Sequence, residues 1–386
     1  MKKYLQLILV SALLATLNAC SYFFDTDNTP TPATLQNFTA AHHPKMLWRT
    51  STGNGSGNEE TKLFPAIANN RVFTASTNGI ISAVDQHTGK ILWQNNIDEP
   101  ISSGVAVNDS LVFAGTRSGQ FFAIRQSDGV KVWQTRVSSE TLAPAVATRM
   151  TVLVKSIDGN VTALATSTGR VLWHYREKEP DLILRGGSAP RILGNTAYAG
   201  FENGVLVALN LKTGRPLWQA TIADPEGIFA IQRMVDIDAN PVAHNNRIFV
   251  ATWQGNIAAL NAIHGQKYWS HHASTASGIT VDNENVYLAD ADSHVSAFDV
   301  MSGHKRWEQD QLTARTLSGP ALMENTIIVG DAEGWLHWIN KNTGEFVART
   351  EVGSSILATP LVSEQVAYVY TKDGQLSAWV LDTSRI

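Results

Sequence analysis

The chain has 386 residues, of which 44% are hydrophobic and 17% charged, and its formal net charge is −4. This composition is typical of a globular protein. The sequence contains no run of basic residues and no interleaving of basic with aromatic side chains. These features exclude the usual electrostatic footprint of nucleic-acid binding, so we expect no nucleic-acid partner.

The N-terminus has the form of an export signal. Two lysines precede an apolar stretch from Leu5 to Leu17, which is too short for a stable membrane span. The stretch ends in Leu17-Asn18-Ala19-Cys20, and Cys20 is the only cysteine of the chain. This arrangement resembles the lipobox of bacterial lipoproteins. The resemblance implies that residues 1–19 are removed as a signal peptide, that Cys20 is lipidated, and that Ser21 directs the protein to the outer membrane.

Residues 20–43 follow as a lipidated N-terminus and a segment rich in Thr, Pro, Asn and Ala. This composition predicts a flexible tether. A triacylated terminus buries more than one chain, so the anchor should be stable. We therefore expect a lipid-anchored protein on the periplasmic face of the outer membrane.

Beyond the tether, the signature A-x-D-x-x-T-G-x-x-x-W recurs, with its first copy ending at Trp93. The later copies end at Trp133, Trp173, Trp218, Trp269 and Trp307, and the seventh has Ala348 in the Trp position. The spacings of 40, 40, 45, 51, 38 and 41 residues are typical of propeller blades. The Asx residue tightens a turn, the Gly accepts a positive φ, and the Ala should receive the Trp ring.

One repeat predicts four strands, at residues 64–68, 71–76, 80–85 and 90–95, with a hairpin at Asn78-Gly79. Eight such hairpins occur, but only seven complete signatures. After the last hairpin, at Asp373-Gly374, the chain ends without a fourth strand, whereas residues 46–50 look like a fourth strand with nothing before it. Trp48 also lies in phase with the repeat. We therefore predict that residues 46–50 complete the last blade.

The predicted fold is all-β, an eight-bladed β-propeller of four-stranded antiparallel blades over residues 44–386. Closure of the ring by the N-terminal strand removes the exposed sheet edges that invite aggregation. We expect the propeller itself to be monomeric.

No motif predicts catalytic chemistry. Gly53–Gly57 lacks the spacing and the Lys of a phosphate loop, so it is interpreted as a solvated loop. Asp236–Asn240 imitates the start of a calcium loop, but Pro241 and Arg247 replace the required Gly and Glu. The adjacent His pairs lack the spaced partners of a metal site. The sequence predicts no catalytic, cofactor-binding or metal-binding residues and a protein that is not an enzyme.

The repeated signature resembles that of quinoprotein-type propellers, whose enzymes bind pyrroloquinoline quinone and calcium and typically carry adjacent cysteines. With its lipobox and eight blades, the whole chain is similar to the BamB family, the lipoprotein B subunits of the bacterial outer-membrane β-barrel assembly machinery. That resemblance implies a non-enzymatic scaffold that binds POTRA domains of the BamA barrel subunit. Unfolded outer-membrane proteins are further candidate partners. Two alternatives are a propeller that binds a small molecule or peptidoglycan in its channel and a quinoprotein-type dehydrogenase.

Two neighbouring connections between blades are longer than the fold requires, and loops of this kind often carry function. They follow Trp173 and Trp218 and connect an outer strand to the next inner strand, so they should lie side by side on the face of the Gly-containing hairpins. The family resemblance implies that partner-binding residues fall here, at Leu182, Leu184, Arg185, Asp236 and Asp238. The leucines would be apolar anchors, Arg185 a paired cation, and the aspartates acidic contacts. In the alternative, the leucines pack beneath the rim and the aspartates cap turns or pair with Arg185 or Arg233.

Overall fold

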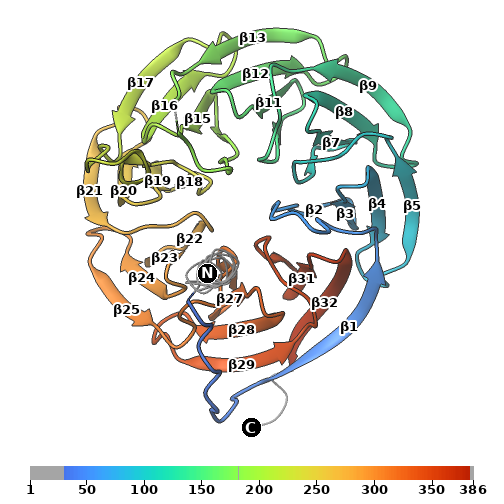
Figure 1. The fold of residues 1–386 in the computed structure, drawn as a ribbon. Helices are drawn as coiled ribbons and strands as arrows, with labels where there is room; N and C mark the ends of the chain where they lie inside the picture. The colour runs from blue at the N-terminus through green and yellow to red at the C-terminus, as the bar shows by residue number, and fades with distance from the viewer. Residues whose placement is uncertain (1–29, 181, 383–386) are drawn as a thin grey trace, which may run out of the picture.

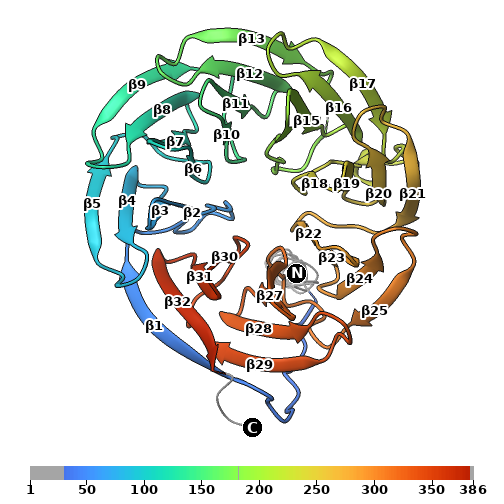
Figure 2. The same cartoon turned by 180° about the vertical axis from the view of Figure 1, so that it is seen from behind.

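A computed structural model describes residues 30–180 and 182–382. Eight four-stranded antiparallel sheets form a closed ring, with the innermost strand of each sheet nearest its centre (Figures 1 and 2). The one helical element in these two ranges is the 3-10 helix η2 (Ala230–Arg233). The described part of the chain contains no helix that combines the length and apolar character of a membrane span. The predicted all-β eight-bladed propeller is confirmed.

The strands of each blade are named below in order from the innermost to the outermost. Blade 1 consists of β2 (Ala66–Ala68), β3 (Arg71–Ala75), β4 (Ile80–Asp85) and β5 (Ile91–Asn96), and blade 2 of β6 (Ala106–Val107), β7 (Leu111–Gly115), β8 (Gln120–Arg125) and β9 (Lys131–Arg136). Blade 3 consists of β10 (Val146–Ala147), β11 (Thr151–Lys155), β12 (Asn160–Ala165) and β13 (Val171–Arg176), and blade 4 of β14 (Arg191–Leu193), β15 (Thr196–Gly200), β16 (Val205–Asn210) and β17 (Pro216–Thr221). Blade 5 consists of β18 (Val242–His244), β19 (Arg247–Ala251), β20 (Asn256–Asn261) and β21 (Lys267–His272), and blade 6 of β22 (Ile279–Val281), β23 (Asn285–Ala289), β24 (Val295–Asp299) and β25 (Lys305–Gln309). Blade 7 consists of β26 (Ala321–Met323), β27 (Thr326–Gly330), β28 (Trp335–Asn340) and β29 (Phe346–Glu351), and blade 8 of β30 (Leu361–Ser363), β31 (Val366–Tyr370), β32 (Gln375–Asp382) and β1 (His43–Ser51).

The core lies between blades rather than inside them. The two middle strands of each blade are buried on both faces, whereas the outer strands expose alternate residues. Each of eight apolar clusters joins side chains from two neighbouring blades. A single blade therefore cannot bury its own faces, and stability depends on completing the ring.

The repeated signature connects one blade to the next. Trp133 on β9 lies opposite Ala123 on β8, as predicted, and its ring lies against Gly169 in the following blade. Its indole N–H donates a 2.8 Å hydrogen bond to the Thr166 carbonyl of that blade. The same indole-to-backbone bond is made by Trp48, Trp93, Trp173, Trp218, Trp269 and Trp307. In the seventh copy the pair is exchanged, because Trp338 on β28 faces Ala348 on β29.

Replacing Trp133 with alanine should destabilise the protein by about 3–5 kcal/mol, the cost of removing a buried aromatic side chain. Trp133→Phe keeps most of the ring packing and loses the hydrogen bond to Thr166, so it should cost only about 1 kcal/mol beyond repacking. Urea unfolding of the two variants measures both values. If both variants lost the same stability, packing of the Trp133 ring would not stabilise the contact between blades 2 and 3.

Strand β1 closes the ring, as predicted. It pairs with β32 in antiparallel register, from His43 opposite Asp382 to Ser51 opposite Gln375. The two strands lie side by side although they come from opposite ends of the chain (Figure 1). The closing strand is longer than the predicted 46–50 because pairing extends past Trp48 in both directions. In blade 1, by contrast, the innermost strand starts at Ala66 rather than at the predicted residue 64.

Residues 33–42 are not a free tether, which corrects the sequence prediction for that part of residues 20–43. Leu35 packs against the core between blades 6 and 7, and Phe38 lies 5.6 Å from Phe346 between ring centroids. Arg349 lies over the Phe38 ring, and the Ala33 N–H donates to the carbonyl of Thr313. Composition suggested a linker, but these apolar side chains hold the segment against the rim. The signal peptide, Cys20 and residues 20–29 lie outside the described residues.

Candidate protein-interaction site

The two inserted loops lie on one face of the ring and contact each other. Residues 177–190 connect β13 to β14, and residues 222–241 connect β17 to β18. Ile222 donates a backbone hydrogen bond to Gly204, which places the second loop on the face of the Gly-containing hairpins, as predicted. The Leu184 N–H donates a 2.5 Å hydrogen bond to Asp236 Oδ2 and thereby joins the two loops.

A third long loop on this face was missed by sequence reasoning. Residues 52–65 connect β1 to β2 and include the Gly-rich run that was interpreted as solvated. The loop is instead largely packed, since Thr52, Ser56, Thr61 and Leu63 are buried. It also reaches the inserted loops, because Arg185 Nη1 lies 3.5 Å from Thr61 Oγ1.

Asp236 and Asp238 are not surface carboxylates, which corrects the expectation that they supply acidic contacts. Asp236 is fully buried and Asp238 is 9% exposed. Asp236 binds the backbone of the neighbouring loop at Leu184, so its role is to position that loop. The carboxylate of Asp238 packs against Gly186, where a Cβ would lie 2.5 Å from Oδ1. This bond to a loop 52 residues away is neither of the alternative roles, a turn cap or an ion pair with Arg185 or Arg233.

Leu182 and Arg185 are the two predicted residues that face solvent. The Leu182 side chain is 45% exposed, whereas Leu184 is half-buried against the channel. The Arg185 guanidinium is half exposed and forms a 2.8 Å ion pair with Glu140, rather than with either aspartate. Glu140 also lies 3.7 Å from Arg117, so one carboxylate orients two cations.

The most exposed apolar residues of this face were not singled out from the sequence. Ile228, Phe229 and Ile231 are 91%, 66% and 61% exposed and lie within four residues of each other at η2. The loop that presents them is held by Gln232, whose side-chain oxygen accepts hydrogen bonds from the N–H groups of Ile228 and Phe229. Three large apolar residues so close together could have been recognised by their spacing. The sequence could not predict that these side chains are exposed, because the same apolar run would also suit a buried segment.

Beneath the loops lies a buried group of charges. Lys155 and Glu202 form a 2.7 Å ion pair with almost no exposure, and Glu179 from the first inserted loop lies beside Glu202. Burial, together with the hydrogen bond to Glu202, raises the pKa of Glu179 to about 9. Burial raises the pKa of Asp236 to about 7 and that of Asp238 to about 6. Glu179 is therefore protonated at neutral pH, where the first inserted loop lies beside the buried Lys155–Glu202 pair of blades 3 and 4.

The raised pKa of Asp236 predicts a pH-dependent stability. The unfolded chain releases this proton near its usual pKa of about 4, whereas the folded protein keeps it up to about 7. The folded state thus binds more protons in this window, and its stability relative to Asp236→Asn should fall as pH rises from about 4 to about 7. Urea unfolding of both proteins at about pH 4.5 and about pH 7.5 tests this. If the difference in unfolding free energy between the two proteins were the same at both pH values, this prediction would be wrong.

The described residues do not fit the cofactor that quinoprotein-type repeats suggest. Within residues 30–180 and 182–382, no group of three or more His, Cys, Asp or Glu could hold a metal ion. The whole sequence has one cysteine, so the adjacent pair typical of those enzymes is missing.

The fold thus defines a closed eight-bladed β-propeller with quinoprotein-type repeats and one face built up by inserted loops. The model of the family described as "Outer membrane protein assembly factor BamB" matches residues 41–98, 77–309 and 291–385. The chain belongs to this family.

Individual relatives agree with that assignment. The outer membrane protein assembly factor BamB of Pseudomonas aeruginosa is 42% identical over 351 residues, which cover 91% of this chain and 92% of the relative. The protein of the same name from Legionella pneumophila is 40% identical over 375 residues, with 96% and 98% coverage. The crystal structure of BamB from Moraxella catarrhalis superimposes with a TM-score of 0.81 at 27% identity and covers 87% of this chain and 99% of that one.

Quinoprotein enzymes share the fold. Quinohemoprotein alcohol dehydrogenase from Comamonas testosteroni has a TM-score of 0.69 at 13% identity, with 87% of this chain and 76% of that one covered. A likeness at this identity concerns the architecture alone.

Proposed function

We propose that this protein serves outer-membrane protein assembly as a non-enzymatic scaffold that docks a POTRA domain of the BamA barrel subunit. The names of its relatives support the assembly role. The docking patch consists of Leu182, Arg185, Ile228, Phe229 and Ile231. The observation that carries the proposal is this patch itself, since clustered exposed apolar side chains mark interaction sites.

The patch has the chemistry of a protein-docking surface. The two loops supply exposed aliphatic and aromatic side chains and an arginine, a residue type enriched at binding hot spots. Backbone N–H groups of its two loops donate hydrogen bonds to the side chains of Asp236 and Gln232 and are held in place by them, so little conformational entropy is lost on binding. We infer that lipidation at Cys20 anchors the protein at the periplasmic face of the outer membrane. Confinement of both partners to one membrane surface would raise their effective concentration.

Replacing both Leu182 and Phe229 with alanine should weaken binding of a purified POTRA fragment by about 30-fold or more, as loss of a hot spot costs at least about 2 kcal/mol. Surface plasmon resonance with the immobilised fragment measures the change. Met301→Ala is the matched control, because Met301 is 64% exposed but lies at the turn between β24 and β25, on the opposite face. Undiminished binding by the double variant would remove the patch from the interface.

A further inference from the structure

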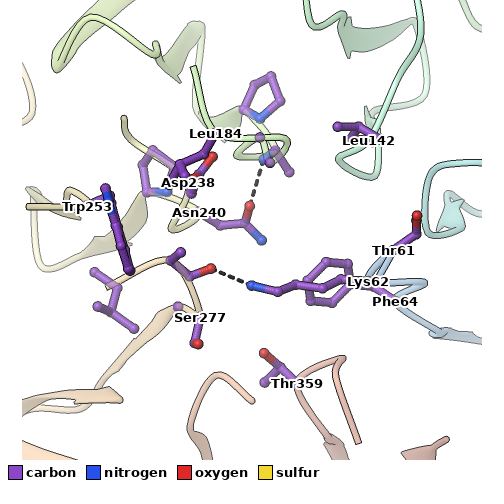
Figure 3. Close-up of a pocket in the computed structure, with 18 of the residues that line it drawn as sticks. Thr61, Lys62, Phe64, Leu142, Leu184, Asp238, Asn240, Trp253, Ser277 and Thr359 are labelled. Atoms are coloured by element: carbon purple, nitrogen blue, oxygen red, sulfur yellow. Dashed lines mark hydrogen bonds between the residues drawn. The ribbon is translucent and has the colours of Figure 1, made fainter. Parts of the chain in front are cut away.

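Charged side chains hold two segments of this chain against distant parts of the ring. In the cavity of about 620 Å³ between the innermost strands, Lys62 Nζ donates a 2.5 Å hydrogen bond to the Ala276 carbonyl (Figure 3). At blade 7, two arginines bind backbone carbonyls of the N-terminal segment, residues 33–42. The described residues that line the cavity include no histidine, whereas the contact at blade 7 is built around His337. The contact at blade 7 therefore contains a group that can titrate near neutral pH.

The centre of this contact is a buried pair, Asp331 and His337. Neither side chain has any exposed surface, and His337 Nε2 lies 2.9 Å from Asp331 Oδ2. The same carboxylate oxygen accepts a 2.6 Å hydrogen bond from Arg315 Nε. Arg349, which lies opposite His337 on the neighbouring strand β29, donates a 3.0 Å hydrogen bond from Nε to His337 Nδ1. The imidazole thus lies between a carboxylate and a guanidinium.

This arrangement fixes the protonation state of His337. A guanidinium can only donate hydrogen bonds, so Nδ1 must carry a lone pair in order to accept from Arg349. Nε2 then carries the proton and donates it to Asp331. A second proton, on Nδ1, would remove the acceptor for Arg349 and would bring a third positive charge to a site with one carboxylate. Neutral His337 is therefore the form that holds Arg349 in place.

Each arginine connects this buried pair to the N-terminal segment. Arg315 Nη1 donates a 3.0 Å hydrogen bond to the Ala33 carbonyl, and Arg349 Nη1 donates a 3.1 Å hydrogen bond to the Gln36 carbonyl. The Arg349 guanidinium also lies over the Phe38 ring, 5.0 Å from its centroid. Arg349 thus makes two of the contacts that keep the segment docked, and its bond to His337 positions it to make them.

We propose that residues 33–42 and blade 7 form a pH-sensitive latch, in which neutral His337 holds the segment through Arg349 and protonation of His337 releases it. The charged groups that face the imidazole are Asp331, Arg315 and Arg349, from three different parts of the chain. Burial lowers the pKa of His337 although the bond to Asp331 opposes this, and the charges of Arg349 and Arg315 lower the pKa further.

The direction of the pH response follows from this depressed pKa. Release of the segment takes Arg349 away from the imidazole, so His337 can bind a proton near its ordinary pKa of about 6.5. The docked state binds fewer protons than the released state below this pH. Docking of the segment should therefore be strongest above about pH 6.5 and should weaken as the pH falls below it.

Release would free the ten residues that directly precede β1. With the lipid proposed on Cys20, these residues would join the anchor to the propeller, so the latch would act on the anchored end of the chain. The latch itself requires neither lipidation nor a partner, because its contacts include no residue of the docking patch. It can therefore fail while the proposed docking function holds, and the reverse.

Hydrogen exchange of residues 33–42 in the complete chain tests the latch. Mass spectrometry gives the exchange rate, and division by the intrinsic rate at each pH gives the ratio of docked to released segment. The N–H groups of Ala33 and Ala41 report this ratio, because they donate to the carbonyls of Thr313 and Val347. For one proton and a released pKa of about 6.5, protection should fall about 30-fold between about pH 7.5 and about pH 5. Equal protection at the two pH values would overturn the proposal.

Three variants identify the titrating group. His337→Gln keeps an N–H for Asp331 and cannot take up a proton, so its segment should be equally protected at both pH values. Arg349→Met removes the guanidinium from a partly exposed position, so protection should be low at both pH values while β28 stays protected. His42→Gln is the matched control, because His42 lies in the segment but outside the network, and it should show the wild-type response.

The variants also state what would disprove the latch. A pH response retained in Arg349→Met, or lost in His42→Gln, would assign the titration to another group. If His337→Gln loosens blade 7 itself, exchange of β28 shows it, and Arg349→Met still decides between the two outcomes, because its side chain is not part of the buried pair.

Discussion

Asp236→Ala should weaken docking of the POTRA fragment by roughly ten-fold or more, although Asp236 is fully buried and cannot contact the partner in this conformation. The substitution removes the acceptor of the hydrogen bond that Leu184 N–H donates from the neighbouring loop and leaves that donor unpaired. Leu182 and Arg185, which flank Leu184 in the same loop, then lose the hydrogen bond that holds this loop to its neighbour. Surface plasmon resonance gives the affinity, and circular dichroism should show an intact β-sheet fold.

Asp236→Asn separates this explanation from a direct charge contact. The amide oxygen can accept the same hydrogen bond from Leu184, so docking should remain within a few-fold of the wild-type affinity. If the asparagine variant lost binding as fully as the alanine variant, the carboxylate charge itself would be required, and the positioning role would be wrong.

A chain that starts at Thr52 lacks β1 and with it the partly buried Trp48 and the whole ladder to β32, so it should lose at least about 3–5 kcal/mol of stability, the cost of removing one large aromatic side chain from a core. Without β1, the edge of β32 is exposed along its whole length, and the ring opens between blades 8 and 1. An exposed edge strand also templates association, so we expect aggregation at concentrations where the complete chain is monomeric. Thermal unfolding and light scattering report the two effects.

A chain that starts at His43 is the matched control. It keeps β1 and removes only the docked segment, with its Phe38 contact to Phe346, so it should remain folded and monomeric. Equal melting temperatures for the two truncated chains would contradict closure of the ring by β1.

The fold was predictable because each blade repeats the same local chemistry. The Asx side chain of Asp85 bonds the N–H groups of His87 and Thr88, and the Gly that follows leaves room for the Trp of the preceding blade. These are contacts over a few residues or one repeat, so they leave a regular pattern in the sequence. Even the strand that closes the ring could be placed, because Trp48 is in phase with the other copies.

The candidate site was only partly predictable, because its residues depend on contacts that have no period. An alternating Asp-Ile-Asp run suits an exposed extended segment, yet Asp236 bonds a backbone N–H that lies 52 residues away. Lys62 follows a Gly-rich run that suggests solvent, yet it reaches the far side of the channel at Ala276. The direction of a loop side chain is decided by such distant partners. The sequence located the two inserted loops but not which of their residues face outward.

With the proposed lipid on Cys20, the packed segment at residues 33–42 would limit how far the propeller extends from the membrane. Ala33 is bound by Thr313 and Arg315 in the loop that joins β25 to β26, on the same side of the ring as the docking patch. Cys20 lies thirteen residues before Ala33, and a chain of that length extends at most about 45 Å. A lipid on Cys20 would therefore keep Ala33, and with it the edge of the ring between blades 6 and 7, within about 45 Å of the headgroups. Under the proposed anchoring, a docked partner domain would be held close to the same membrane surface.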